Sequence, residues 1–180
     1  MNLHLTDRIW NLLLKTAFGP LNYSTTNDLP ANQQVIPYGP ARHALNSLRG
    51  EMDEVKNESG TTLTVDEPMH THAGIRKMVL RFNASQRLEG ISITWEAGGS
   101  TFRNLKSWLD QEIKTAKCHR LGYDLACRYE LNDARIELVG NPLGFGMSRK
   151  VTLSCFLGPG EKMAGMFHGL GKKNAMNAAA

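Results

Sequence analysis

The sequence lacks the features that define several classes of protein. No apolar run approaches the roughly 18 residues that a membrane-spanning helix needs. The N-terminus carries Asp7 and Arg8 where a secretory signal would be apolar. Three cysteines in 180 residues are odd in number and too few for a disulfide framework. These absences predict an intracellular protein without a transmembrane segment, and 41% hydrophobic residues are enough to form one core.

Motifs of catalysis and metal binding are also missing. His70 and His72, or Cys118-His119 with Cys127, do not have the paired spacing of a structural zinc site. The sequence contains neither a G-x-S-x-G nucleophile elbow nor a P-loop. We therefore predict no catalytic residue, no metal, no cofactor and no enzymatic activity. A small enzyme that uses the Cys118 thiol or an unrecognised acid pair is the third of three alternatives for function.

Charge is distributed unevenly along the chain. The 21 basic and 17 acidic residues give a net charge of +4. Residues 51–67 hold six acids and one lysine (1 − 6 = −5), whereas residues 76–120 hold nine bases and four acids (9 − 4 = +5). Two segments of opposite charge can dock head to tail between copies of the chain. Asp53 and Glu54 are therefore predicted self-association residues.

The basic segment contains the residue types that contact phosphate groups, because Lys and Arg neutralise the phosphates of nucleic acid or of anionic lipid. The predicted phosphate or lipid contacts are Arg76, Lys77, Arg81, Arg103, Lys106, Lys114, Lys117 and Arg120. The predicted partners are thus a second copy of the chain, a nucleoprotein or nucleic acid, and an anionic membrane surface. A small basic RNA- or DNA-binding domain is the main alternative function.

An apolar helix is predicted at the start of the chain. Thr6 is a suitable N-cap, and Gly19-Pro20 is typical of a helix end. The apolar face is wide for such a short helix, and a polar linker follows it, so the helix can pack on its own core or on a neighbouring subunit. The residues of this face that we predict to take part in self-association are Ile9, Trp10, Leu13 and Phe18.

Two further helices follow from apolar stripes with a spacing of three and four residues. The first runs from Gly39-Pro40 to residues 57–60, and the second begins at Ser100 or Thr101 and is closed by Gly122. The stripe of the first helix consists of Ala41, Leu45, Leu48, Met52 and Val55, and that of the second of Phe102, Leu105, Leu109, Ile113 and Ala116.

Alternation of apolar and polar residues predicts strands in the rest of the chain. These segments lie at residues 63–65, 78–82, 91–95, 123–131, 136–138 and 151–157. The expected fold is α+β: a mostly antiparallel sheet of about five to six strands, two to three packed helices, and mobile termini. The expected organisation is an N-terminal helix or arm at 1–20, a linker at 21–38, a core domain at 39–157 and a flexible tail at 158–180.

Residues 77–117 carry a family resemblance. The strand 91–95 (ISITW), then Thr101-Phe102-Arg103 at the start of a helix, and Trp108 within that helix resemble the opening of the core of rhabdovirus matrix proteins, most closely the short plant-infecting type. The resemblance implies a virion protein, in the cytoplasm or the virion interior, that condenses a nucleocapsid and contacts membrane. The chain differs from the animal-virus members because it has neither a Lys-rich N-terminus nor a Pro-Pro-x-Tyr motif. The predicted function is therefore that of a non-enzymatic, self-associating, matrix-like structural protein.

Overall fold

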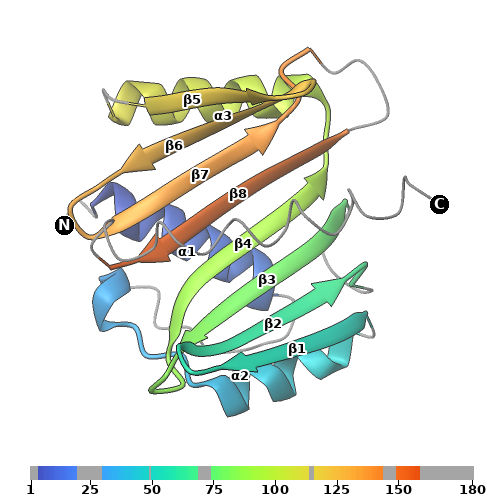
Figure 1. Ribbon diagram of the computed structural model, residues 1–180, viewed down its shortest axis with the longest axis vertical. Helices are drawn as coiled ribbons and strands as arrows, with labels where there is room; N and C mark the ends of the chain where they lie inside the picture. Colours follow the sequence, from blue (N-terminus) through green and yellow to red (C-terminus); the bar gives the residue numbers. More distant parts are fainter. Residues whose placement is uncertain are drawn as a thin grey trace.

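One antiparallel sheet of eight strands organises the protein (Figure 1). The computed structural model describes residues 4–19, 30–48, 50–68, 74–113, 116–143 and 149–158. The strands are β1 (Glu51–Asn57), β2 (Gly60–Asp66), β3 (Ile75–Asn83), β4 (Leu88–Glu96), β5 (Ala116–Leu121), β6 (Asp124–Glu130), β7 (Ala134–Gly140) and β8 (Lys150–Leu157). The α+β class is as predicted, but the sheet has more strands than the expected five to six.

The strand order is β1-β2-β3-β4-β8-β7-β6-β5. Strands β1 to β4 form one meander and strands β5 to β8 form a second one, and the two meanders join through their last strands, β4 and β8. A helix precedes each meander, so the architecture repeats although no repeat is visible in the sequence. This topology leaves β1 and β5 as the two edges of the sheet.

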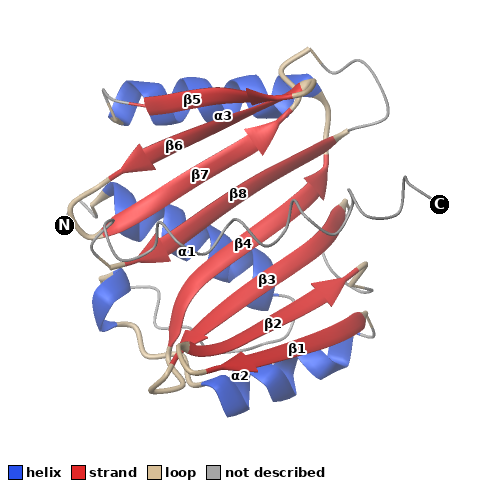
Figure 2. Ribbon diagram, in the orientation of Figure 1, coloured by secondary structure: helices blue, strands red, loops and turns tan. Residues whose placement is uncertain are grey.

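The helices all lie on one face of the sheet (Figure 2). They are α1 (Leu5–Phe18), α2 (Tyr38–Leu45) and α3 (Gly99–Glu112), accompanied by short 3-10 turns at Ala31–Gln33 and Asn46–Leu48. Alternate side chains of the strands point toward these helices and form the core, as in Leu80, Ile93 and Leu153. Among the described residues no helix covers the opposite face, where Thr94 and Thr152 share a hydrogen bond of 2.9 Å across the β4–β8 seam.

Helix α1 packs against β4 and β8 and belongs to the core. Ile9, Trp10, Leu13 and Phe18 are all fully buried. The structure therefore corrects the prediction that these four side chains offer a self-association surface, because their apolar face is already covered by the chain's own sheet. Residues 21–29 of the expected linker and residues 159–180 of the expected tail lie outside the described residues.

The predicted second helix is wrong after Leu48. Helix α2 ends at Leu45, and the segment from Glu51 is an edge strand. Gly50 lies at the change of direction, where an added Cβ would come within 2.7 Å of the Asp66 carbonyl oxygen, so a side chain does not fit there. The apolar stripe that suggested one helix thus combines the buried residues of α2 with residues of β1.

The third helix is also shorter than predicted. Helix α3 ends at Glu112, and Ile113 already has extended backbone angles. The following residues 116–121 form β5, which pairs with β6. Gly122 adopts a φ of +64° in the turn between these two strands, where it closes a hairpin instead of a helix.

The burial of α1 gives the first prediction. Trp10→Ala should lower the free energy of unfolding by about 3–5 kcal/mol, the usual cost of removing a large side chain from a core. Leu12→Ala on the same helix should change it by less than about 1 kcal/mol, since Leu12 is 42% exposed. Urea denaturation of both variants at a protein concentration low enough to favour monomers measures the difference. Equal stability of the two variants would show that α1 is not part of the core.

Candidate assembly interface at the sheet edges

The two edge strands carry opposite charge. Strand β1 holds Glu51, Asp53 and Glu54 against Lys56, which gives 1 − 3 = −2. Strand β5 holds Lys117 and Arg120 and no acid, which gives +2 with His119 neutral. The acidic segment 51–67 thus forms β1 and β2 at one border of the sheet, whereas the basic segment 76–120 runs through β3, β4 and α3 and reaches the opposite border only at β5.

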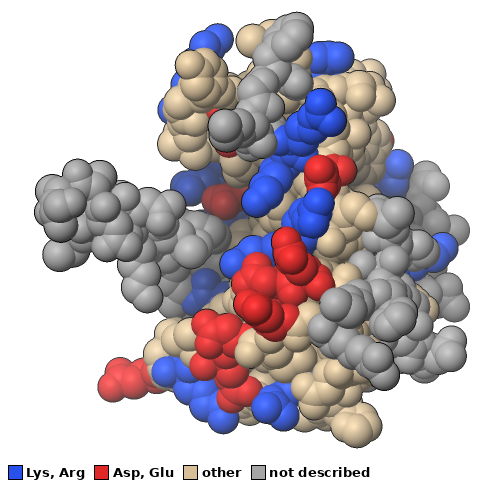
Figure 3. All heavy atoms as spheres, turned by 90° about the vertical axis from the view of Figure 1, so that its right-hand side faces the viewer, with Lys and Arg blue, Asp and Glu red and all other residues tan. Residues whose placement is uncertain are grey.

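Figure 3 shows this separation on the side of the molecule where β4 ends and β8 begins. The acidic side chains gather in the lower half, toward β1 and β2, and most Lys and Arg side chains cross the middle and the upper half.

Strand β1 offers Asp53 but not Glu54 to a partner. The Glu54 carboxylate points toward α2, where it accepts hydrogen bonds from the Tyr38 hydroxyl and, at 3.0 Å, from Arg42 Nε, and it lies 2.7 Å from Lys56 Nζ. Lys56 and Tyr38 hold the pKa of Glu54 at about 2, followed by a smaller effect of Arg42. Asp53 points to the opposite face and is exposed, and within the described chain no ion pair engages it. Glu54 is thus engaged within its own chain, and the self-association role of Asp53 stays a prediction.

Strand β5 is the most exposed strand of the sheet. Its residues are exposed except for the half-buried Ala116, and none of them forms an ion pair within the described parts of the chain. A disulfide joins Cys118 to Cys127, the residue directly opposite on β6. This bond was not expected from an odd number of cysteines. The third cysteine, Cys155, is fully buried, and its burial raises the pKa of the thiol to about 12.

The predicted phosphate contacts do not form one basic face. Arg76, Lys77 and Arg81 lie on β3, Arg103 and Lys106 on α3, and Lys117 and Arg120 on β5, while Lys114 lies outside the described residues. Acidic neighbours already neutralise several of them. These ion pairs are Arg76 with Glu96, Lys77 with Asp66 at 3.1 Å, Arg81 with Glu89 at 3.3 Å, and Lys106 with Asp110 at 2.5 Å.

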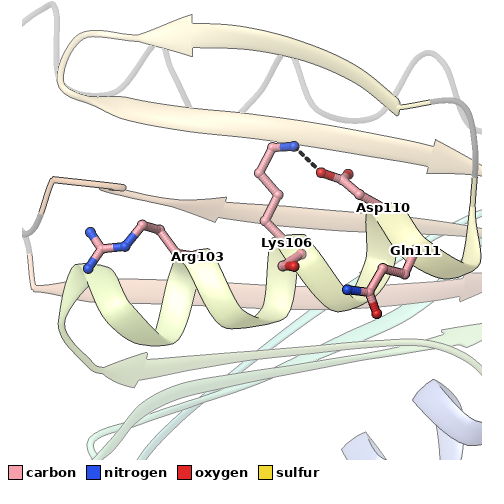
Figure 4. Close-up of a pocket in the computed structure, with 5 residues that line it drawn as sticks. Arg103, Lys106, Asp110 and Gln111 are labelled. Atoms are coloured by element: carbon pink, nitrogen blue, oxygen red, sulfur yellow. Dashed lines mark hydrogen bonds and ion pairs between the residues drawn. The ribbon is translucent and has the colours of Figure 1, made fainter.

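A shallow pocket lies beside α3 and is lined by Arg103, Lys106, Ser107, Asp110 and Gln111 (Figure 4). Lys106 and Asp110 reach toward each other from successive turns of the helix. Asp110 also accepts a hydrogen bond of 2.9 Å from the Tyr129 hydroxyl, which ties α3 to β6. Asp110 thus connects Lys106 of the same helix to Tyr129 of the sheet, while Arg103 donates to the Pro142 carbonyl.

A corner of exposed apolar side chains adjoins β5. Leu121, Tyr123 and Leu143 are 54%, 89% and 68% exposed. Their chain segments lie at the same end of the sheet, because Leu125 at the start of β6 pairs with Gly140 at the end of β7. Arg103 donates a hydrogen bond of 2.5 Å to the Pro142 carbonyl at this place, and Arg120 precedes Leu121, so cations border the apolar corner. We call these three apolar residues the apolar corner.

Comparison with known proteins does not assign the chain to a family. No family model matches the chain, and neither a curated protein nor a solved structure similar to it was found. Within the described residues no group of His, Cys, Asp and Glu side chains is placed to hold a metal ion. No helix of the described chain has the length and apolar character to cross a membrane.

The low pKa of Glu54 predicts an acid-sensitive link between β1 and α2. A depressed carboxyl pKa contributes stability that is present above the unfolded-state value of about 4.5 and is lost as the pH falls toward 2. Glu54→Gln should therefore be less stable than the wild type at pH 6, and the difference should vanish near pH 2. Urea denaturation of both proteins across this range tests the prediction, which a constant difference would contradict.

Proposed function

We propose that the protein is a non-enzymatic structural subunit that self-associates head to tail, with strand β1 of one copy adding to strand β5 of the next. The observation that carries the proposal is the opposite charge of the two edge strands of a single sheet. Of the matrix-like role implied by the sequence resemblance, we propose two parts: this self-association and docking to an anionic surface. Binding to a nucleoprotein stays a prediction.

Strand direction favours this arrangement. All neighbouring strands are antiparallel and their number is even, so β1 and β5 run in opposite directions. A second copy shifted along the sheet, without being turned over, therefore places its β5 antiparallel to β1 and keeps its helices on the same side. The outer backbone groups of an edge strand are a ready template for such strand addition.

Charge selects this pairing over the symmetric ones. A β1–β1 contact would bring Asp53 and Glu51 against the same acids of the partner, and a β5–β5 contact would bring Lys117 and Arg120 against the same cations. Like charges directly opposite each other in a sheet are destabilising. Only the unlike edges are complementary, and an interface between unlike surfaces that does not close into a ring builds an open chain of subunits.

One register pairs every residue of β5 with a residue of β1 and also keeps the two faces of the sheet in phase. It places residues 51–56 of one copy opposite residues 121–116 of the next, with Asp53 opposite His119 and diagonal to Lys117. Opposite-charge pairs in a sheet contribute about 0.2–1 kcal/mol each. We therefore assign most of the affinity to the backbone ladder, and the choice of partner and register to the charged pairs.

Charge reversal at the edges tests the proposal. Asp53→Lys and Lys117→Asp should each reduce self-association. An equimolar mixture of the two variants should assemble again with alternating copies, because the wild-type edges match each other and so do the two reversed edges. The double variant Asp53→Lys/Lys117→Asp should recover assembly, because its edges are again complementary. Sedimentation velocity at low salt measures the size distribution of the assemblies. In 1 M salt the assemblies should be smaller, since the Debye length falls to about 3 Å.

Glu58→Lys is the matched control for this experiment. It makes the same change of charge in the same hairpin, but Glu58 lies in the turn between β1 and β2 and not on the edge. It should leave assembly nearly unchanged. If Glu58→Lys weakens assembly as much as Asp53→Lys does, general charge and not the edge strand controls association, and the proposal is wrong.

The apolar corner supports a second candidate function, docking to an anionic membrane surface. Exposed aromatic and leucine side chains at the tips of turns can enter the interface of a bilayer, and neighbouring cations attract anionic lipid, each contributing about 1 kcal/mol near the surface. Tyr123 and Leu143 lie at such tips, and Arg103 and Arg120 lie beside them. Such docking leaves β1, at the far edge of the sheet, available to another copy.

Tyr123→Ser/Leu143→Ser should reduce binding to vesicles of phosphatidylcholine and phosphatidylserine by about tenfold or more. Fully burying one such side chain contributes about 1.5–3 kcal/mol, and about 1.4 kcal/mol corresponds to a factor of ten. The control Leu12→Ser/Val35→Ser removes two other exposed apolar side chains, 42% and 54% exposed, that lie elsewhere. Co-sedimentation with vesicles measures binding, and an equal effect of both double variants would argue against the apolar corner.

A further inference from the structure

The two edges of the sheet are held in different ways. Strand β1 is tied to α2 through the Glu54 carboxylate and its partners Tyr38 and Arg42. Among the described residues no side-chain hydrogen bond or ion pair joins β5 to another element. Its ties are the backbone ladder to β6, the half-buried Ala116 and the Cys118–Cys127 disulfide. The disulfide is therefore the one covalent link that fixes this edge to the sheet.

The two sulfur atoms of this disulfide differ in access. Cys118 is exposed on the edge strand, whereas Cys127 on β6 is only 1% exposed. The helix predicted from the sequence would place Cys118 near its C-terminal end, where the negative end of the helix dipole disfavours a thiolate. Cys118 lies instead in strand β5, so this effect does not act on it. Arg120 points to the same face two residues along β5, and a neighbouring cation favours a thiolate. An incoming thiol thus meets Cys118 first.

We propose that the Cys118–Cys127 pair is a reversible redox site that controls whether β5 is an ordered edge strand. The site is a target for a cellular thiol reductant, of the dithiol-protein or glutathione class. Its consequence for assembly rests on the proposed function, because β5 is one of the two edges that join copies. A disulfide at an exposed edge is the kind that thiols reach, in contrast to a buried structural one.

The reaction is thiol–disulfide exchange. A reductant thiolate attacks the exposed Cys118 sulfur and forms a mixed disulfide, and the electron pair of the broken S–S bond leaves on the Cys127 sulfur, which takes up a proton. A second reductant thiol then attacks the mixed disulfide and releases the Cys118 thiolate. The reductant becomes a disulfide. The protein gains two electrons and, when both of its cysteines end as neutral thiols, two protons. The reverse sequence with an oxidised thiol reagent restores the bond.

Reduction should loosen β5 selectively. Five of its six residues are exposed, so little apolar burial remains to hold the strand once the covalent link is broken. Strand β1 keeps its contacts to α2 in both states and serves as an internal reference. Reduction therefore changes one edge of the sheet and leaves the other edge and the core intact.

The test compares the full chain in oxidised form and after reduction with dithiothreitol. Amide hydrogen exchange in residues 116–121 should become roughly tenfold faster on reduction, while exchange in residues 51–57 stays the same. Brief alkylation of the reduced protein should label Cys118 before Cys127 and Cys155. Cys118→Ser/Cys127→Ser should exchange in β5 like the reduced wild type and not respond to dithiothreitol, and Cys155→Ala should respond like the wild type.

Two results would overturn the redox site. The first is unchanged exchange in β5 on reduction, and the second is an equal increase of exchange across all strands, which would make the disulfide a general staple of the fold. Sedimentation of the same samples separates this inference from the proposed function. Selective loosening of β5 with loss of assembly supports both, whereas selective loosening with unchanged assembly supports the redox site and contradicts the proposed β1–β5 contact.

Discussion

The pairing of β4 with β8 determines the arrangement of the rest of the protein. Every other strand pair joins strands that follow each other in the chain, whereas this pair joins Ile93 to Leu153. It links two meanders that are each local, and α1 packs across the two strands on the core side. Because the meanders join through their last strands, their first strands, β1 and β5, are forced to the outside. The charge separation between the edges is thus a consequence of one long-range pairing.

The central strands were predictable because their residues alternate strictly. Ile91, Ile93, Leu153 and Cys155 face the core from the β4–β8 seam, and the same period of two marks β3, β6 and β7. The number of strands was underestimated because β1 and β5 do not alternate in this way. An edge strand that is exposed on most sides needs few apolar residues, so its sequence carries little of the signal on which strand prediction depends.

The same two strands were read as continuations of helices. Met52 and Val55 stand at helical spacing from Leu48, and Ala116 from Ile113, so the apolar stripes extend past the real helix ends. The backbone of Gly50 and pairing with β2 and β6 override this local preference. The charged residues themselves could be identified from the sequence, and Asp53 lies exposed on an edge strand. That Glu54 turns inward and that Cys118 meets Cys127 depends on strand register, which a single sequence does not reveal.

The difficulty of predicting β1 and β5 and their fitness as contact surfaces have a common origin. A strand with little buried surface leaves a weak pattern in the sequence, and it also gains little stability from the core. Such a strand is held by other interactions: the hydrogen bonds of the Glu54 carboxylate for β1 and the disulfide for β5. In the proposed assembly, a second copy that adds its opposite edge supplies one further interaction to the strand, through backbone groups on the outer side of the sheet. Alanine or serine substitutions in the core would not distinguish such a role from ordinary folding, because they destabilise the whole domain. Changes of charge at the exposed residues Asp53 and Lys117 leave the core and the strand pairing within the chain unchanged, so they test the contact between copies.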